Sequence, residues 1–152
     1  MRLAPGTAEL DWLLRHSSLP ALVKGVLHVD DARVLRDAGV AGVVVSNHGG
    51  RALDDAQATL AVLPGIRAAL GEHFPLLLDG GIRSGSDAFK AIALGADAVL
   101  VGRLQAYALA AAGALGVAHL LRLLREELEL CMAQSGCATL ADVRHAALLH
   151  PF

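Results

Sequence analysis

Short apolar runs alternate along the chain with longer stretches in which apolar residues recur every three or four positions. The apolar runs are rich in Val, Leu and Ala, are typical of buried strands, and lie at residues 21–26, 42–47, 75–78 and 98–101. The stretches with helical spacing lie at residues 8–16, 32–38, 57–70, 88–94, 117–135 and 139–146. This alternation predicts an α/β fold with a parallel sheet and right-handed crossovers, either open or part of a closed barrel.

Capping residues, proline and glycine mark where these helices are expected to begin and end. Asp30 and Asp31 favour the start of the second helix, and Thr139 is expected to cap the last one. Pro64 lies inside the stretch at 57–70, so we expect that helix to be interrupted or restarted there. Helix ends are expected at Gly39, Gly95 and Gly136.

Charged side chains stand at equivalent points where the apolar runs end. Lys24, His48, Asp79 and Arg103 are separated by 24, 31 and 24 residues, the length of one strand, one helix and two loops. In parallel sheets and barrels the loops that leave the carboxyl ends of the strands converge on one opening, where ligands bind. We therefore expect these four side chains to meet at one site.

The segment from Ser46 to Arg51, Ser-Asn-His-Gly-Gly-Arg, places a base, two glycines and a cation directly after a strand. The glycines permit positive φ angles and a close approach of ligand to backbone. Arg51 can hold a carboxylate through two parallel hydrogen bonds while His48 takes a proton beside it. The pattern predicts a site for a small acid. The alternative is that His48 only packs or caps locally.

Two further patterns indicate an anionic ligand. Lys24 lies in an apolar strand, where an ammonium group is costly unless it faces an opposite charge; the alternative is that it reaches solvent. Two glycine-rich segments at the last two strand ends are typical of a phosphate site built from backbone N–H groups and a helix N-terminus. Their residues are Asp79, Gly80, Gly81, Ile82 and Arg83 in the first segment, and Gly102 and Arg103 in the second.

The composition argues against other classes of function. The chain is 55% hydrophobic and 3% aromatic with a net charge of -2, and no basic segment is interleaved with aromatics, so nucleic-acid binding is not expected. Cys131 and Cys137 match neither a zinc motif nor a disulfide framework, so no metal site is expected. The first residues show no apolar segment followed by a cleavage site, which favours a cytoplasmic location.

Between Arg103 and Arg122 the chain runs without Asp, Glu, Lys or Arg, over a length sufficient for a transmembrane helix. This run is rich in alanine and contains Gln105, Tyr107 and His119 together with two glycines. Alanine contributes little to insertion into a bilayer. We therefore expect a buried pair of helices here and no contact with a membrane.

Together these motifs resemble those of the FMN-dependent 2-hydroxy-acid oxidases and dehydrogenases, the family of glycolate oxidase, lactate oxidase and mandelate dehydrogenase. The resemblance is carried by Leu19 to Gly25, Ser46 to Asp54, Asp79 to Arg83 and Val101 to Arg103. It spans nearly the whole chain but only the C-terminal half of the family pattern. Residues 1–152 are therefore expected to form a single half-barrel domain, strands 5–8 of a TIM (β/α)₈ barrel with C-terminal helices, truncated at the N-terminus.

The resemblance implies FMN as cofactor and the oxidation of a small 2-hydroxy acid to the 2-oxo acid. It makes His48 and Lys24 catalytic: His48 removes a proton from the substrate, and the charge of Lys24 beside the flavin ring stabilises the reduced, anionic form. Arg51 would bind the substrate carboxylate with His48, Ser46 would contact the flavin ring, and Asp79 would hold the ribityl hydroxyls. The other cofactor-binding residues, most of them around the phosphate, are Gly80, Gly81, Ile82, Arg83, Gly102 and Arg103.

The chain departs from the family pattern in three places. Ser84 and Leu104 stand where many relatives have Arg and Pro, changes expected to loosen the phosphate loop without removing a ligand. The part of the family pattern that holds the active-site tyrosines is not matched. Two alternatives therefore stand beside the enzyme: a non-catalytic FMN- or phosphate-binding remnant, and an inactive fragment that needs a separate N-terminal half.

Four strands leave two open edges, because only a closed barrel has none. The edge strands at 21–26 and 98–101 are apolar and carry nothing that discourages pairing. We therefore expect a homo-oligomer, in the form of a two-fold dimer in which the fourth strand of each copy pairs with the first strand of the other, or association with a complementing N-terminal half.

Overall fold

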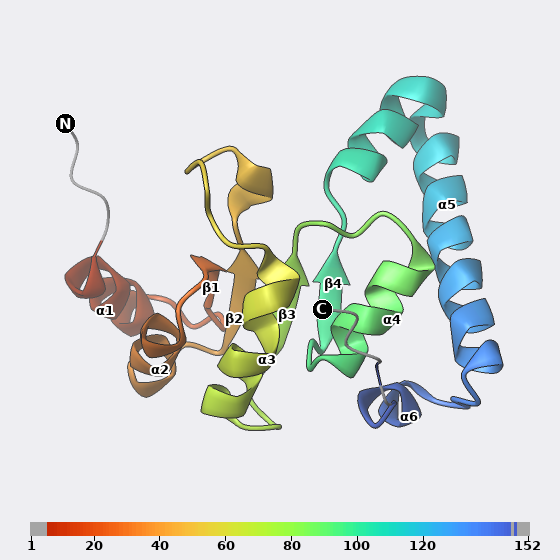
Figure 1. The fold of residues 1–152 in the computed structure, drawn as a ribbon. Coiled ribbons are helices and arrows are strands. Elements are labelled where there is room, and N and C mark those ends of the chain that lie inside the picture. The colour runs from red at the N-terminus through yellow and green to blue at the C-terminus, as the bar shows by residue number, and fades with distance from the viewer. Residues whose placement is uncertain (1–5, 147, 149–152) are drawn as a thin grey trace.

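The computed structural model of the chain describes residues 6–146 and 148, with strands and helices in the expected alternation (Figure 1). The strands are β1 (Leu22–Val26), β2 (Gly42–Ser46), β3 (Leu76–Asp79) and β4 (Ala98–Leu100). The helices are α1 (Thr7–His16), α2 (Val29–Asp37), α3 (Thr59–Leu70), α4 (Gly85–Ala93), α5 (Arg103–Gln134) and α6 (Leu140–Arg144), with one 3-10 turn, η1 (His48–Gly50). Each predicted strand is confirmed to within one residue at either end.

The described strands form one parallel sheet in the order β1-β2-β3-β4. Val44 of β2 pairs with Lys24 of β1 and Leu77 of β3, and Leu77 pairs in turn with Ala98 of β4. β1 and β4 are the edges of this sheet, as the sequence predicts. Parallel strands added one after another and linked by helices are the arrangement found within a TIM barrel.

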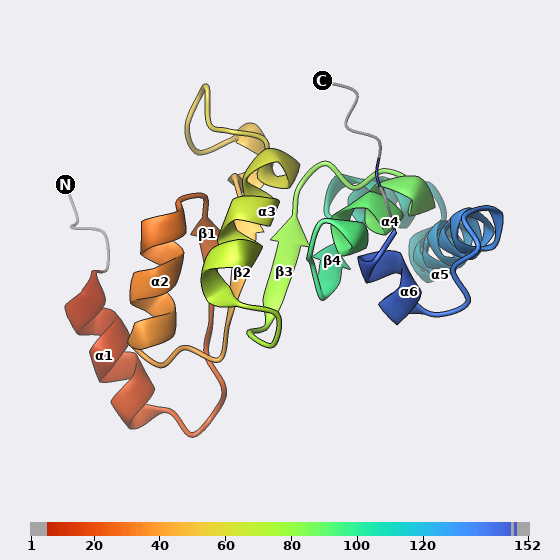
Figure 2. The ribbon, with the colours of Figure 1, turned by 60° about the horizontal axis from the view of Figure 1, so that its bottom comes forward.

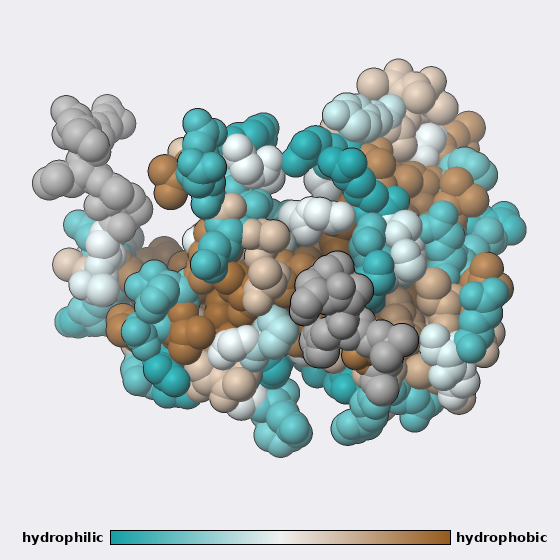
Figure 3. Space-filling view, viewed as in Figure 1, coloured by the Kyte–Doolittle hydropathy of each residue, from teal (hydrophilic) through white to brown (hydrophobic). Residues whose placement is uncertain are grey.

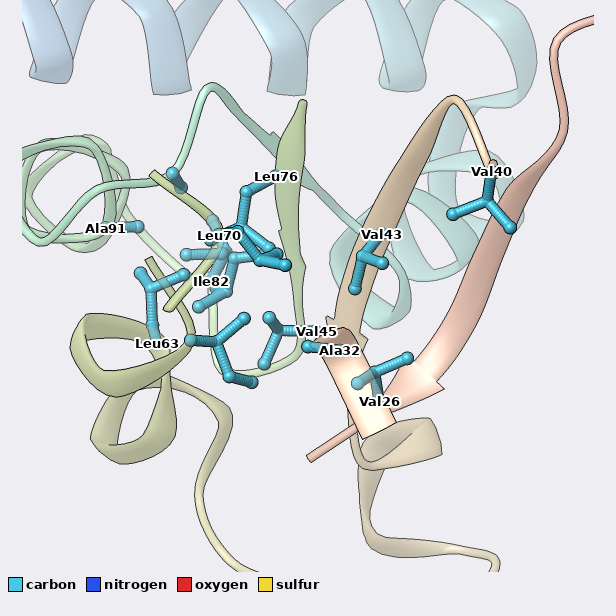
Figure 4. Packing of buried hydrophobic residues seen from close by; sticks show 13 residues of the cluster. Val26, Ala32, Val40, Val43, Val45, Leu63, Leu70, Leu76, Ile82 and Ala91 are labelled. Atoms are coloured by element: carbon cyan, nitrogen blue, oxygen red, sulfur yellow. The ribbon is translucent and has the colours of Figure 1, made fainter. Parts of the chain in front are cut away.

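Helices α2, α3 and α4 pack on the sheet, and α2 and α3 also pack against each other (Figures 1 and 2). The main hydrophobic core fills the space between these two layers (Figure 4). Val43 and Val45 of β2, Leu76 of β3, and Leu63 and Ile66 of α3 are completely buried in it. Each such side chain stabilises the fold by about 1.5–3 kcal/mol relative to an exposed one, so this core accounts for the packing of the helical layer on the sheet.

The opposite face of the sheet carries the alternate residues of the same strands. No described helix lies along it, and Leu22, at the start of β1, is 47% exposed. Lys24, Ser46 and Asp79 all belong to this face and lie at or near the carboxyl ends of their strands. In a closed barrel this face lines the interior. Its polar side chains are therefore gathered where a barrel holds its ligand.

The start of α2 differs from the prediction. The helix begins at Val29 because His28, not an aspartate, caps it: the Nδ1 atom of His28 accepts a hydrogen bond of 3.2 Å from the amide of Asp30. Asp30 and Asp31 lie in the first turn, where carboxylates interact favourably with the positive end of the helix dipole.

Helix α3 is continuous through Pro64, so the predicted interruption is wrong. A proline inside a helix removes one backbone hydrogen bond and costs about 3 kcal/mol. Leu63 and Ile66, on either side of it, are completely buried against the sheet. Burial of these side chains offsets the cost of the missing bond and keeps the helix in one piece.

Helix α5 consists of two arms rather than one straight rod. Ala112 and Gly113 leave the helical conformation, with φ of -148° and 58°, and separate an arm at 103–111 from one at 114–134. The predicted helix pair is confirmed, but its predicted burial is wrong: no residue of α5 is buried, because it packs mainly against α4. By length and composition α5 is the one described helix that could cross a membrane, so the absence of membrane contact stays a prediction.

An ion-pair network joins α3, β3, β4 and α6 at the amino ends of the strands. Arg67 of α3 donates to Asp97 Oδ2 at 2.8 Å, and the same oxygen accepts from the Leu76 amide at 2.8 Å. The other carboxylate oxygen is paired with Arg144 of α6. Arg67 also donates to the backbone carbonyls of Gly71, Phe74 and Gly95. Burial alone would raise the pKa of Asp97, but hydrogen bonds from Leu76, Arg144 and Arg67 outweigh it and lower that pKa.

We expect Asp97→Asn to lower the free energy of unfolding at neutral pH by about 1–3 kcal/mol, because it removes the charge that both arginines face. A lowered pKa in the folded state contributes stability above the unfolded value of about 3.9, and that stability is lost as the pH falls through the folded pKa. Wild type and Asp97→Asn should therefore differ less in free energy of unfolding at acidic pH. Urea unfolding at neutral and acidic pH measures both effects. Asp37→Asn, which removes an exposed carboxylate, serves as the control; an equal loss in both variants would contradict the prediction.

Candidate active site

A cleft of about 670 Å³ opens at the carboxyl ends of the strands. It lies between the loop after β2 and the first arm of α5, where the surface is hollowed and hydrophilic side chains gather (Figure 3). Its lining includes every predicted site residue except Ser46: Lys24, His48, Arg51, Asp79, Gly80, Gly81, Ile82, Arg83, Gly102 and Arg103. The sheet therefore brings the four strand ends to one opening, as predicted.

Ser46 lies behind the lining of the cleft and is completely buried. Its hydroxyl donates to Asp79 Oδ2 at 2.6 Å and accepts from Lys24 Nζ at 3.1 Å and from the His48 amide at 3.1 Å. A hydroxyl has one donor and two acceptor positions, and all three are used here. This placement does not support the predicted contact of Ser46 with a flavin ring. The side chain instead holds three cleft residues in fixed positions.

Lys24 and Asp79 form an ion pair of 2.8 Å across β2. The opposite charge that Lys24 was predicted to face is therefore the carboxylate of Asp79. Burial alone would raise the pKa of Asp79, but hydrogen bonds from Lys24 and Ser46 and the charge of Lys24 outweigh it and lower that pKa. The carboxylate thus stays ionised at neutral pH, and it uses only Oδ2 for both partners. Oδ1 accepts no hydrogen bond within the described residues and is not buried, so it is available to a ligand in the cleft.

His48 lies on the turn η1 directly after β2, in a left-handed conformation with φ of 55°. Its ring packs against the backbone of Gly25, where an added Cβ would come within 2.7 Å of His48 Nε2. Gly25 itself has φ of 102° at an irregularity in β1, so both its conformation and this contact require glycine. Within the described residues the ring has no hydrogen-bond partner, which leaves it free to take a proton from a ligand in the cleft.

Arg51 ends the same turn, and its Nε donates to the carbonyl of His48 at 3.3 Å. Asn47 stabilises the turn from the other side, because its Oδ1 accepts from the amide of Gly49 at 3.1 Å. The two terminal nitrogens of Arg51 have no partner in the part of the chain that the structure describes. They form a fork of the kind that binds a carboxylate through two parallel hydrogen bonds. The base, His48, and the carboxylate-binding guanidinium of Arg51 thus lie on one short turn.

The N-terminus of α4, which follows the first glycine-rich segment, is already filled by protein carboxylates. Glu127 of α5 accepts from the amide of Gly85 at 2.7 Å, and Asp87 accepts from the amide of Arg83 at 3.0 Å. The side chain of Ser84 caps the same helix. A phosphate group placed there would meet two negative charges. The helix N-terminus expected to bind phosphate is therefore not that of α4.

The N-terminus of α5 offers the better phosphate site. This helix begins after Gly102 without a capping side chain and borders the cleft. The amides of Gly81 and Gly102 have no acceptor among residues 6–146 and 148, and a Cβ at either glycine would meet no atom within 4 Å. Arg83 and Arg103 line the same cleft. Free N–H groups, open backbone and two guanidinium groups fit a phosphate monoester.

The charges of the cleft favour an anionic ligand with more than one binding group. Lys24, Arg51, Arg83 and Arg103 face a single carboxylate, that of Asp79. The described residues contain no cluster of His, Cys, Asp or Glu that could hold a metal ion. The cleft thus combines a cradle for phosphate with a base and a fork for a carboxylate.

Comparison with known proteins decides which family uses this arrangement. A family model described as FMN-dependent dehydrogenase matches residues 1–150. The chain belongs to the FMN-dependent dehydrogenase family. Its curated relatives include an L-lactate oxidase from Alicycliphilus denitrificans, 65% identical over 97% of this chain and 40% of that protein. Glycolate oxidase 1 from Oryza sativa subsp. indica is 50% identical over 91% of this chain and 37% of that protein.

Solved structures show the same family fold. A mandelate oxidase variant with a monooxide FMN adduct superimposes with a TM-score of 0.91 at 48% identity, over 94% of this chain and 46% of that one. Mandelate oxidase with benzoyl-formic acid gives the same TM-score and identity, over 94% of this chain and 43% of that one. The chain spans about two-fifths of the length of the curated relatives. The half-barrel predicted from the sequence is thus part of the barrel of the FMN-dependent oxidases.

Leu100, Ala106 and Tyr107 line the cleft of this FMN-dependent dehydrogenase chain but were not predicted as site residues. Tyr107 stands one helical turn after Arg103, so the two share a face of α5. Sequence analysis expected a pair of helices after Arg103 but gave bounds only for the second, from residue 117, so it did not place Tyr107 one turn after Arg103. The signal that identifies it is its spacing of four from Arg103.

We expect Ser46→Ala to raise the pKa of Asp79, because the carboxylate loses one of the hydrogen bonds that favour its ionised form. The folded protein should also lose about 1–3 kcal/mol of stability, since the amide of His48 and the ammonium of Lys24 lose a buried partner. Carbon-detected NMR titration of the aspartate side chains measures the first effect. Ser135→Ala, at the end of α5, is the matched control. An unchanged Asp79 titration in Ser46→Ala would contradict the role assigned to the hydroxyl.

Proposed function

We propose that this chain supplies the base, the substrate-binding cation and the phosphate cradle for the FMN-dependent oxidation of a small 2-hydroxy acid to the 2-oxo acid. The observation that carries the proposal is the convergence of His48, Arg51 and Lys24 on one cleft with the open N-terminus of α5. The substrates named for the relatives and structural neighbours, lactate, glycolate and mandelate, support this class of acid.

The cleft residues fit FMN in three parts. Gly81, Gly102 and the Arg83 and Arg103 side chains would hold the phosphate, since their N–H groups face open space beside the start of α5. The free Oδ1 of Asp79 would accept from ribityl hydroxyls. Lys24 would lie beside the ring. When bound, FMN supplies the acceptor for the two electrons that leave the hydroxy acid.

Arg51 and His48 would act together on the substrate. The free end of the Arg51 guanidinium binds the carboxylate and fixes the α-carbon of the acid above the turn. Oxidation of R–CH(OH)–COO⁻ to R–CO–COO⁻ releases two protons and two electrons. The ring of His48, which has no partner in the described residues, would take one of these protons, and FMN, when bound, would accept the two electrons together with the other.

Lys24 would act electrostatically. Its ammonium group is bound to Asp79 and Ser46, and the Lys24 side chain is 41% exposed at the cleft. A positive charge fixed at this point stabilises negative charge that develops on a neighbouring ligand. Because Ser46 and Asp79 hold Lys24 in place, little reorganisation is needed when that charge appears.

The reaction is tested by mixing the FMN-loaded protein anaerobically with lactate, glycolate and mandelate and following the flavin absorbance. We expect at least one acid to bleach it. His48→Ala should slow bleaching by about 10²–10⁴-fold, the usual contribution of a general base. His73→Ala removes an exposed histidine outside the cleft and should behave like wild type. FMN binding without bleaching by any of the acids would refute the catalytic proposal and favour a non-catalytic FMN-binding role.

A second variant tests substrate binding separately. Arg51→Lys keeps the positive charge but loses the planar fork, so we expect kcat/KM to fall by about 10- to 100-fold, mainly through a higher KM. Lys90→Arg, a charge-conserving exchange on α4 away from the cleft, is the control. Equal kcat/KM for Arg51→Lys and wild type would exclude Arg51 as the carboxylate ligand.

We also propose that the uncovered face of the sheet is closed by another polypeptide, either a second copy of this chain or a separate N-terminal half. Two observations support this: β1 and β4 are edges of the described sheet, and Leu22 on the inner face is about half exposed. Sedimentation velocity of the purified chain is the test. We expect a dimer; a cooperatively unfolding monomer at micromolar concentration would refute association through these edges.

A further inference from the structure

Arg103 reaches across the cleft to the turn that carries the base. Its Nη2 donates to the carbonyl of Gly49 at 3.0 Å, although the two residues are 54 positions apart. A Cβ on Gly49 would come within 3.4 Å of the same nitrogen. The first residue of α5 is thus joined directly to η1.

The turn that Arg103 holds is conformationally costly. His48, Gly49 and Gly50 have φ of 55°, 71° and 72°, the left-handed region. A non-glycine residue in this region costs on the order of 1–3 kcal/mol and persists only when its surroundings fix it. The other hydrogen bonds of η1 come from Ser46, Asn47 and Arg51, its own neighbours in sequence. Arg103 is the partner that another strand end contributes to this turn within the described residues.

The Arg103 guanidinium can hold an anion at the same time. It has five N–H donors, and one is used on Gly49. The others have no partner in the described chain, and the side chain lines the cleft with the open backbone of Gly81 and Gly102. Arg83 lines the same cleft but makes no side-chain hydrogen bond to η1. The two arginines therefore differ in one respect: only Arg103 touches both the anion cradle and the turn.

We propose that Arg103 is a positioning residue that couples the binding of a phosphate group to the order of the turn carrying His48 and Arg51. An anion on one edge of the guanidinium immobilises the side chain, so the bond to Gly49 then forms with a smaller loss of conformational entropy. Coupling of this kind is reciprocal: the ordered turn also improves the affinity for the anion. The proposal rests on the phosphate cradle of the proposed function and adds a link between cofactor binding and the catalytic turn.

Hydrogen exchange of the purified chain, with and without saturating inorganic phosphate, tests the coupling. In wild type we expect phosphate to slow exchange both in the cradle, residues 80–84, and in the turn, residues 48–55. Arg103→Ala should speed exchange of the turn about three- to tenfold without phosphate, the equivalent of one lost hydrogen bond. With phosphate at saturation, the cradle of Arg103→Ala should still be protected from hydrogen exchange, but its turn should not. Strand amides at 43–45 report whether each variant is folded.

Arg83→Ala is the matched control, because it removes the same charge from the same cleft without touching the turn. Arg83→Ala should need a higher phosphate concentration to reach saturation. At saturation its turn should be fully protected from hydrogen exchange. Arg103→Lys should restore phosphate affinity in part and leave the turn unprotected, since a lysine does not present the fixed fork that can bond an anion and Gly49 together.

The outcomes separate the coupling from the proposed function. If phosphate protects neither the cradle nor the turn in wild type, the phosphate cradle itself is refuted, and the proposed function and the coupling fail together. If it protects the cradle alone, the cradle stands and the coupling is refuted. Equal protection of the turn in Arg103→Ala and Arg83→Ala at saturation would also overturn the role of Arg103. Repeating the series with FMN shows whether the cofactor acts as phosphate does.

Discussion

The buried hydroxyl of Ser46 is the interaction on which the site depends. Register places it directly beside Asp79 on β3, and the same face of β1 brings Lys24 to its other side. Its third hydrogen bond fixes the amide of His48. The positions of Lys24, Asp79 and His48 therefore all depend on the sheet. The Ser46 hydroxyl uses its one donor and both acceptor positions, so moving any of its three partners leaves a buried hydrogen bond unmade. Precision in this cleft therefore comes from strand register.

Loops complete the site in a different way. The turn η1 and the start of α5 lie at the surface. One hydrogen bond joins Gly49 of η1 to Arg103 of α5, and one joins the His48 amide to Ser46 at the end of β2. Such bonds contribute about 0.5–1.5 kcal/mol each and can break and form without unfolding the core. The groups that would hold the substrate and the phosphate are thus adjustable, while Lys24 and Asp79 are fixed. An anionic ligand that contacts both kinds of group would hold the loops against the sheet.

Sequence reasoning found the strand ends and the charged residues and most of the glycines that line the cleft, because hydrophobic periodicity, glycine placement and charge are local signals; it did not find Leu100, Ala106 or Tyr107. It missed features that depend on contacts between distant segments. Glu127 reaches the start of α4 from 42 residues away, and no local pattern indicates that it occupies a helix N-terminus expected to bind phosphate. The complete burial of Ser46 was not predicted, because it depends on neighbours from other strands. Pro64 was expected to break a helix because burial of its neighbours against the sheet cannot be weighed from sequence alone.

The exposure of Lys24 shows how the site depends on what covers the sheet. Interaction between charges varies inversely with the local dielectric constant, so at 41% exposure much of the field of this ammonium group is screened by water. Covering the inner face would strengthen its attraction for an anionic ligand and also its ion pair with Asp79. The ion pair with Asp79 and the hydrogen bond to Ser46 would then hold the ammonium group more firmly at the point where negative charge develops on a ligand. Closure of the sheet would thus strengthen both the positioning and the field of Lys24.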